Sequence, residues 1–155
     1  VEEVAALLSA AGQPTDVLQL SLQPLLVRSG ERVLLFDTGG GPNFAQGGQL
    51  PAALQAAGVA PADVTDVFIS HKHFDHVGGL VTAQGAPAFP NARVHLSEAE
   101  WTAFQADESG AAVAKAVAGQ VQPFKAGAEL VPGVVTAVAD AGHTPGHSAF
   151  LIGSG

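Results

Sequence analysis

Four side chains of metal-ligand type occupy six consecutive positions in the stretch HKHFDH, residues 71–76, here called the first loop. They are His71, His73, Asp75 and His76. The apolar run DVFIS before them favours a short buried strand. Residues two apart in an extended segment point to the same side, so His71 and His73 can direct their imidazoles at one ion. Asp75 and His76 follow where a pair of glycines lets the chain turn, and they could face a second ion nearby.

A second loop bears the further ligand that such a site needs. Of the six histidines, five lie in two short loops, and GHTPGH, residues 142–147, is the second loop. It also follows a predicted strand, so both loops are expected at the edge of a sheet, where sites are usually built. We expect His143 to be the third ligand of the first ion. His147 would either support the site or pack within the turn, and His95 would be a solvated or packed strand residue.

The donor types limit the metals and the chemistry. The chain has no cysteine, which excludes disulfides and thiolate ligands. Imidazole and carboxylate suit zinc, iron or manganese better than they suit a soft-ligand copper site. Two such ions bridged by a water would lower its pKa, generate hydroxide at neutral pH and clamp a carbonyl or phosphoryl oxygen.

Other catalytic patterns fit the sequence less well. A Ser–His–Asp triad could use Ser70 or Ser148, but neither lies in the G-x-S-x-G nucleophile pattern. DTGGG occurs once, whereas aspartic proteases need two carboxylates that share a proton. The same glycine run lacks the G-K-[ST] ending of a phosphate-binding loop. Asp37, at the end of a predicted strand, is expected to brace the first loop from behind.

Length and composition indicate one globular domain of 155 residues, 47% hydrophobic and 13% charged. A net charge of −8 with only six Lys and Arg argues against a nucleic-acid partner. No apolar run reaches membrane-spanning length, so a membrane partner is not expected. We expect a small-molecule substrate instead. The chain opens at Val1 and contains no Met, which suggests an incomplete chain.

Hydrophobic patterning and capping signals predict an α/β architecture with functional loops at strand ends. Helices are expected at residues 1–11, 51–57, 98–106 and 110–118. Strands are expected at residues 18–28, 32–37, 66–70, 92–97, 134–140 and 149–153. Ser97 and Glu100 form a predicted capping box before the third helix.

Three segments together resemble the metallo-β-lactamase fold superfamily. SHKHFDHVGG matches its H-x-H-x-D-H motif with paired glycines, LLFDTG matches the preceding strand, and GHTPGH matches the loop with the next ligand. The resemblance covers about residues 20–153 and is closest to the lactonase and organophosphate-hydrolase-like branch. It implies part of an αββα sandwich, comprising its N-terminal half and the start of the second half.

The resemblance also implies a dinuclear site, usually zinc, with iron or manganese as other choices. His71, His73 and His143 would hold the first metal, and Asp75 and His76 the second. Asp75 would also orient the attacking water. The expected reaction is attack by a metal-bound hydroxide on an ester, lactone, β-lactam, thioester or phosphoester.

The chain ends at Gly155, before the bridging Asp and final His of that family pattern. Residues 1–155 are therefore expected to be one metallo-β-lactamase-like domain that is incomplete at its C-terminus. The alternative is a non-catalytic metal-binding domain, or an inactive truncated one that lacks ligands for the second metal. Assembly with another chain, such as a homo-oligomer, would be a further way to supply the missing strands.

Overall fold

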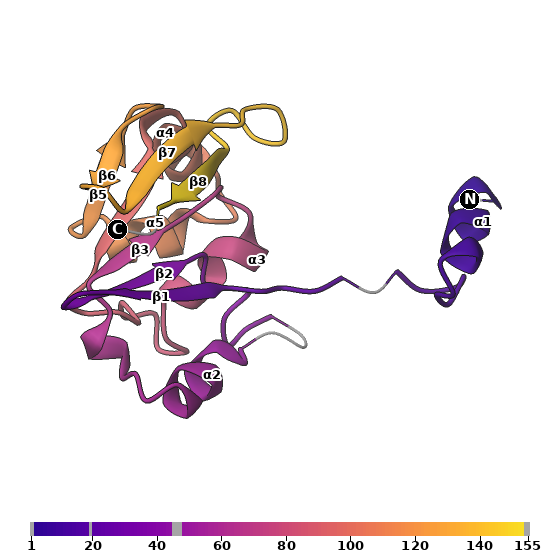
Figure 1. Cartoon of the computed structure of the whole chain (residues 1–155), viewed down its shortest axis with the longest axis horizontal. Helices are drawn as coiled ribbons and strands as arrows, with labels where there is room; N and C mark the ends of the chain where they lie inside the picture. Colours follow the sequence, from indigo (N-terminus) through magenta and orange to yellow (C-terminus); the bar gives the residue numbers. More distant parts are fainter. Residues whose placement is uncertain (1, 19, 45–47, 154–155) are drawn as a thin grey trace.

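The computed structural model describes residues 2–18, 20–44 and 48–153, which form two packed sheets with helices on one side (Figure 1). The first sheet has the order β1-β2-β3-β4-β5 and the second the order β6-β7-β8. The strands are β1 Leu25–Ser29, β2 Arg32–Phe36, β3 Asp66–Phe68, β4 Arg93–Ser97, β5 Val121–Phe124, β6 Glu129–Val131, β7 Val135–Ala139 and β8 Ser148–Ile152. The α-helices are α1 Glu2–Ala10, α2 Leu50–Ala56, α3 Phe74–Val77, α4 Glu98–Ala106 and α5 Ala111–Val117, with short 3₁₀ turns at Pro61–Asp63 and Gly78–Leu80.

Strand direction explains why the site forms at one edge. β1 and β2 make an antiparallel hairpin, and β2, β3, β4 and β5 then pair in parallel. Carboxyl ends of parallel strands meet at the same edge of a sheet. The loops after β2 and β3 and the start of α4 after β4 therefore lie together there.

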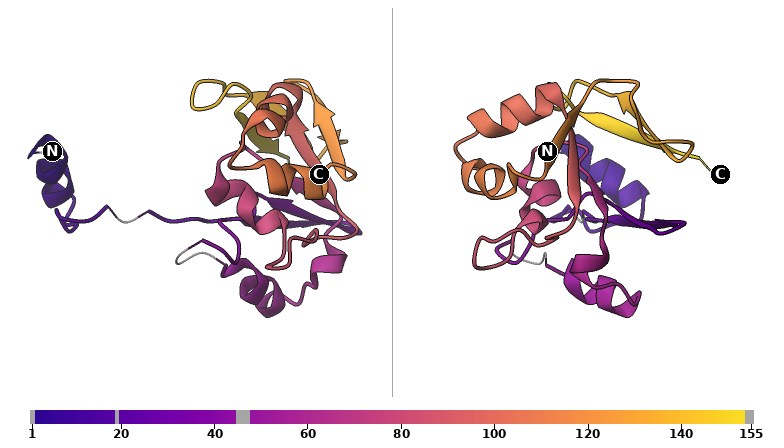
Figure 2. Two further views of the ribbon diagram at one scale, coloured as in Figure 1. Left: turned by 180° about the vertical axis from the view of Figure 1, so that it is seen from behind. Right: turned by 90° about the vertical axis from the view of Figure 1, so that its left-hand side faces the viewer.

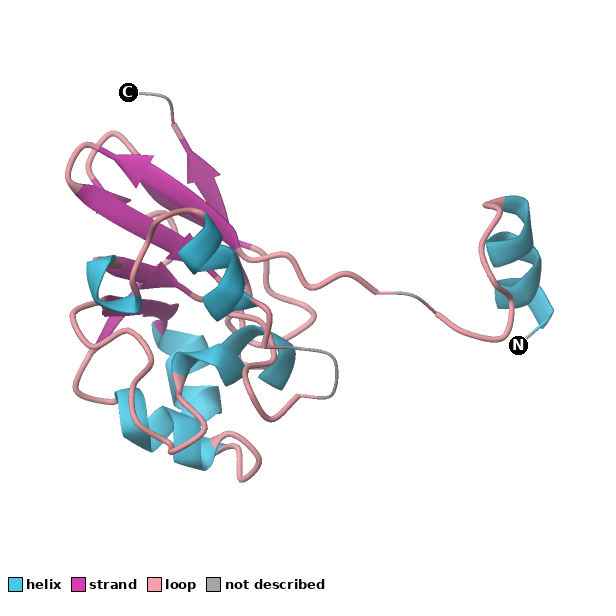
Figure 3. Ribbon diagram, turned by 90° about the horizontal axis from the view of Figure 1, so that it is seen from below, coloured by secondary structure: helices cyan, strands magenta, loops and turns pink. Residues whose placement is uncertain are grey.

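Alternation along β2 divides the core into two layers. Val33 and Leu35 face a cluster shared with α2, α4 and α5, whereas Leu34 and Phe36 face the second sheet. Phe36 stacks on Phe68 of β3 with ring centroids 4.8 Å apart. Burying each of these large apolar side chains contributes roughly 2 kcal/mol. The described residues thus form helices, sheet and sheet, the first three layers of the expected αββα sandwich (Figure 3).

Most predicted elements are confirmed to within two residues, but the strand expected at 18–28 is wrong over most of its length. β1 begins only at Leu25, because that residue already pairs with Phe36, the last residue of β2. Residue 19 lies outside the described part. The structure also contains β5, β6 and α3, which the sequence did not predict. β5 includes Pro123 and is an edge strand, the place where a sheet tolerates proline.

The N-terminal helix is formed as expected, but none of the other described residues covers its apolar face. α1 lies away from the sheets at the end of an extended segment in every view (Figures 1 and 2). Val4 is 54% exposed and Leu7 is 68% exposed. None of the described helices is long and apolar enough to cross a lipid bilayer.

A buried carboxylate connects neighbouring strands at the amino end of the parallel sheet, opposite the edge that bears the histidine loops. Asp66, at the start of β3, accepts hydrogen bonds from Arg32 Nη1 at 3.2 Å and Arg93 Nε at 3.1 Å. Thr65 Oγ1 lies 2.8 Å and His95 Nε2 2.9 Å from the same carboxylate. Burial alone would raise the pKa of Asp66, but the hydrogen bonds from His95 and Thr65 and the charge of Arg93 outweigh it and lower that pKa to about 2.

Candidate metal centre

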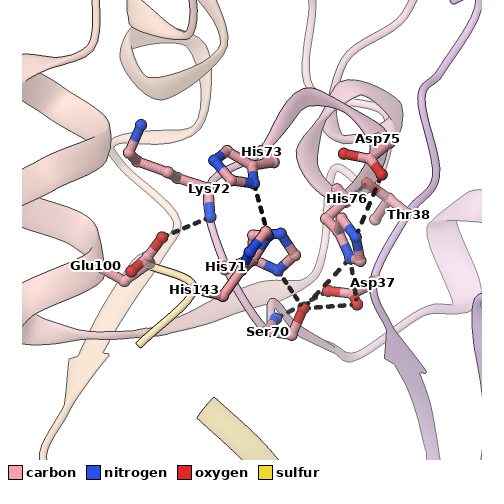
Figure 4. Close-up of polar contacts among 10 residues, drawn as sticks. All are labelled: Asp37, Thr38, Ser70, His71, Lys72, His73, Asp75, His76, Glu100 and His143. Carbon is pink, nitrogen blue, oxygen red and sulfur yellow. Dashed lines mark hydrogen bonds and ion pairs between the residues drawn. The ribbon is translucent and has the colours of Figure 1, made fainter. Parts of the chain in front are cut away.

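The two histidine-bearing loops meet at the carboxyl edge of the first sheet (Figure 4). His71 and His73 follow β3, and His143 lies between β7 and β8. One ring nitrogen from each of these three residues lies within 4.8 Å of the other two. His73 Nδ1 and His143 Nε2 are 3.0 Å apart. The expected convergence of the first and second loops is therefore present.

A backbone contact holds the two loops side by side. The N–H of Ser148, at the start of β8, donates to the carbonyl oxygen of Ser70 at 3.0 Å. Ser70 directly precedes His71, so this bond joins the two sheets next to the histidines.

Asp75 and His76 lie on α3, a one-turn helix, rather than in an irregular turn. The carbonyl of His73 starts this helix by accepting the N–H groups of His76 at 2.9 Å and Val77 at 3.1 Å. As a result, His76 Nε2 faces Asp75 Oδ2 at 3.5 Å. These two side chains lie beside the three imidazoles, with the rings of His76 and His71 3.9 Å apart, and their role as ligands of a second metal stays a prediction.

Close backbone packing explains the two glycines after α3. Thr38 donates to the His76 carbonyl through its N–H at 2.9 Å and its hydroxyl at 2.7 Å, and Gly79 N–H donates to the Gly39 carbonyl at 3.1 Å. A Cβ atom at Gly78 would meet the carbonyl of Gly40, and one at Gly79 would meet that of Thr38. Because glycine has no Cβ atom, the loop after β2 can pack directly against the backbone at the end of α3.

His71 is held in the form that binds metals. It is only 4% exposed, and burial lowers its pKa to about 4, with the neighbouring imidazoles of His76, His147, His73 and His143 adding to the effect. The ring is therefore neutral at pH 7, as a metal-binding imidazole must be. Its Nδ1 lies 3.0 Å from the hydroxyl of Ser70, which orients the ring.

Asp37 braces the first loop, as the sequence predicted. Its Oδ1 accepts the N–H of Ser70 at 2.8 Å, and its Oδ2 accepts the Ser70 hydroxyl at 2.8 Å. The same Oδ2 lies 2.8 Å from Nδ1 of His76. Burial disfavours the His76 cation, but the hydrogen bond and charge of Asp37 and the charge of Asp75 raise the pKa of His76 above its ordinary value. The bond to Asp37 leaves Nε2 of His76 directed at Asp75.

If Asp75 and His76 hold a second metal, Asp37→Asn is expected to weaken its binding without unfolding the loop. Asp37 has a left-handed backbone with φ 54°, which Asn tolerates, but an amide cannot accept all three donors. Changes behind a metal ligand cost about 10–100-fold in affinity, so the second equivalent of zinc should bind that much more weakly. A zinc titration against a chelator measures this, with Asp16→Asn, an exposed aspartate, as control. Unchanged affinity for both equivalents would contradict the role of Asp37.

The two remaining histidines, His95 and His147, lie outside the three converging imidazoles. His95 is buried and stacks on Phe68 with centroids 4.7 Å apart, so it is a packed strand residue. His147 is half-buried, with Nδ1 3.2 Å from Asp140 Oδ2 and its ring 5.0 Å from that of His71. It therefore adjoins the imidazole group without belonging to the three that converge.

The predicted capping box is only half formed. Ser97 Oγ accepts the N–H of Glu100 at 3.1 Å, but the Glu100 side chain does not return to the cap. It lies instead between the first and second loops, bonded to Lys72 and Gly146. Sequence reasoning missed this role, because the first turn of a helix normally exposes its acidic residues. The one available signal was that α4 follows a buried strand next to the site.

A groove of about 560 Å³ opens beside Asp75. Its apolar wall is formed by Leu20, Leu22, Pro24, Phe44, Leu50 and Ala53. A smaller cleft of about 230 Å³ brings Asp37, Asp75 and His76 to the same side. Another cavity, of about 330 Å³, lies by α2 and is lined without any of the histidines. Of these three spaces, only the smaller cleft is lined by a histidine, and it shares Leu22, Pro24 and Asp75 with the larger groove.

Comparison with known proteins gives consistent results. Residues 24–155 match the family model described as the metallo-beta-lactamase superfamily. An N-acyl homoserine lactonase of Bacillus cereus is 29% identical over 159 residues, covering 90% of this chain and 61% of that protein. The structure of AidC, a dizinc quorum-quenching lactonase in complex with the product N-hexnoyl-L-homoserine, superposes with a TM-score of 0.89 at 27% identity, covering 99% of this chain and 60% of that one. The hydrolase AbOPH of the beta lactamase superfamily gives a TM-score of 0.85 at 26% identity, with 99% and 59% coverage.

The chain spans about 60% of the length of these relatives. Within that span, the family model covers both sheets and both histidine-bearing loops, and the αββα-type layering agrees with the structural neighbours. The first loop, the second loop and the strand before Asp37 are the segments on which the sequence resemblance rested. The chain belongs to the metallo-beta-lactamase superfamily.

Proposed function

We propose that this protein is a metal-dependent hydrolase that opens lactones. His71, His73 and His143 would hold the first metal, and Asp75 and His76 the second. The observation that carries the proposal is the convergence of three imidazoles from two separate loops, with ring nitrogens within 4.8 Å of one another. The chain belongs to the metallo-beta-lactamase superfamily, and the proteins similar to it include lactonases. Both findings support hydrolysis as the reaction class.

The donor set fits zinc. Three imidazole nitrogens are the protein ligands of a catalytic zinc site that keeps one position open, and iron or manganese accept the same donors. A bound metal would supply an acidified water and a Lewis acid for the carbonyl oxygen. Neutral His71 meets the requirement that metal binding places on an imidazole ligand, and the bond to Asp37 leaves Nε2 of His76 directed at Asp75.

The chain's own residues would position the water and the substrate. Asp75 is half-buried, faces His76 and borders the groove, so its carboxylate can accept a hydrogen bond from the attacking water. The apolar groove beside it suits a lactone with a hydrocarbon substituent. A relative named N-acyl homoserine lactonase and a lactonase solved with the product N-hexnoyl-L-homoserine agree with such a substrate.

A substrate panel tests the proposal. The purified protein, loaded with zinc, is expected to hydrolyse N-acyl homoserine lactones and to lose that activity on dialysis against a chelator. Zinc should restore the activity. Phosphotriesters, thioesters and β-lactams serve as alternatives for the same site, and faster turnover of one of them would overturn the lactone assignment. Zinc bound without turnover of any ester would indicate the non-catalytic metal-binding alternative.

A further inference from the structure

The fully buried carboxylate of Glu100 bonds to both loops. This side chain, on the first turn of α4, has 0% exposure. Oε1 accepts the N–H of Lys72 at 2.7 Å (Figure 4). Oε2 accepts the Thr144 hydroxyl at 2.8 Å and the Gly146 N–H at 2.9 Å. One oxygen thus serves the first loop and the other serves the second.

These contacts fall next to the three converging histidines. Lys72 lies between His71 and His73 in the chain, and Thr144 directly follows His143. A displacement of the carboxylate would therefore be transmitted through one peptide unit to each side of the imidazole group. None of the other described side-chain hydrogen bonds links the first loop to the second through one shared side chain outside the histidines.

The chemistry of the three contacts requires a carboxylate. Both loops present donors to Glu100, and only a carboxylate offers an acceptor oxygen to each side. A glutamine would place its NH₂ group against either the Lys72 N–H or the Gly146 N–H, leaving a buried donor without a partner. Hydrogen bonds to a charged acceptor are also stronger than neutral ones, which suits a rigid connection.

Helix α4 is fixed to the same two loops at further points. The Ser97 hydroxyl, which caps the helix, donates to the Gly146 carbonyl at 2.7 Å. A Cβ atom at Gly146 would meet the backbone nitrogen of Glu100, so this part of the second loop lies directly on the helix. At the other end of α4, the ammonium of Lys72 pairs with Asp107. The helix therefore gives Glu100 a fixed base.

We propose that Glu100 is a positioning residue that sets the spacing between the His71–His73 pair and His143. By holding the two loops together, it determines the affinity of the first metal position. The role in metal affinity rests on the proposed function, whereas the connection between the loops does not.

Glu100→Gln tests the proposal, with Glu98→Gln on the exposed side of the same helix turn as the matched control. Zinc affinity, measured by competition with a chelator, should fall about 10–100-fold in Glu100→Gln and stay within about twofold in the control. Amide hydrogen exchange of the metal-free protein should become faster at Lys72 or Gly146. Exchange at Leu34, in the core of β2, should not change.

Glu100→Gln with zinc affinity and loop exchange equal to the parent protein would overturn the proposal. Faster exchange at Leu34 by the same factor would also overturn it, since the effect would then be general loss of stability. If the parent protein binds no zinc, the proposed function fails, while loop exchange still decides the role of Glu100. Should Glu100→Gln not fold, Thr144→Val removes only one donor and should raise exchange at Gly146 and weaken zinc binding; no change in either would overturn the proposal.

Discussion

His71→Ala is expected to lower the rate of hydrolysis severely and to reduce bound zinc to well below one equivalent per chain. His71 is the buried member of the three converging imidazoles, and alanine leaves only two ring nitrogens for the first metal. Loss of a Lewis acid removes several kcal/mol of transition-state stabilisation, which corresponds to a fall of roughly 10³-fold in rate. Metal analysis by mass spectrometry and kcat/KM for a lactone measure the two effects.

His95→Ala is the matched control, because it removes another buried imidazole from the opposite end of the strands. It should lower the free energy of unfolding through the loss of a partner of Asp66. Zinc content and kcat/KM should stay close to those of the parent protein. Full zinc content and full activity in His71→Ala would show that the three imidazoles are not the first metal position.

Asp66→Asn is expected to give the largest loss of stability. The Asp66 side chain is buried and accepts bonds from two arginines, a threonine and a histidine. An amide of the same size keeps the volume but removes the charge and turns one acceptor into a donor. Breaking a buried charge pair costs about 3–5 kcal/mol, and the lower end applies because both arginines are partly exposed. Urea unfolding monitored by circular dichroism measures the change.

The pH dependence of stability provides an independent check. The pKa of Asp66 is lowered in the folded state from 3.8 to about 2, so its contribution is complete above pH 4 and is lost as pH falls towards 2. At about 1.4 kcal/mol per pKa unit, the contribution is about 2 kcal/mol. Asp66→Asn should lose this part of the acid dependence, and Asp16→Asn, at an exposed position, should retain it. Equal acid dependence in Asp66→Asn and the parent protein would contradict the assignment.

The candidate site was predictable from the sequence because its ligand-type side chains lie close together in the chain. The spacing of His71, His73, Asp75 and His76 depends on neighbours within a few positions, and short strands are visible as apolar runs. The long-range pairing of the first loop with the second loop was also predictable, since each follows a strand. For the same reason β2, β4 and α4 were predicted to within two residues of their bounds.

The missed features depend on partners that are distant in the sequence. Glu100 is charged and lies in a helical first turn, and only the assembled loops show that it is buried. β5 has little alternation and contains Pro123, so its place at the edge of the sheet is decided by β4. The segment 20–24 has strand-like residues, but no strand of the described residues pairs with it, because β2 ends at Phe36.

Asp37 illustrates how a residue can resist replacement without contacting a substrate. Its left-handed backbone admits few residue types other than glycine, asparagine and aspartate, and its three donors need a carboxylate. Glycine satisfies the first requirement and fails the second, and glutamate does the reverse. A saturation library at this codon should therefore return aspartate almost alone, with a tolerance profile as narrow as that of a metal ligand. A residue that only positions metal ligands, such as Asp37, would then tolerate as few substitutions as the ligands themselves.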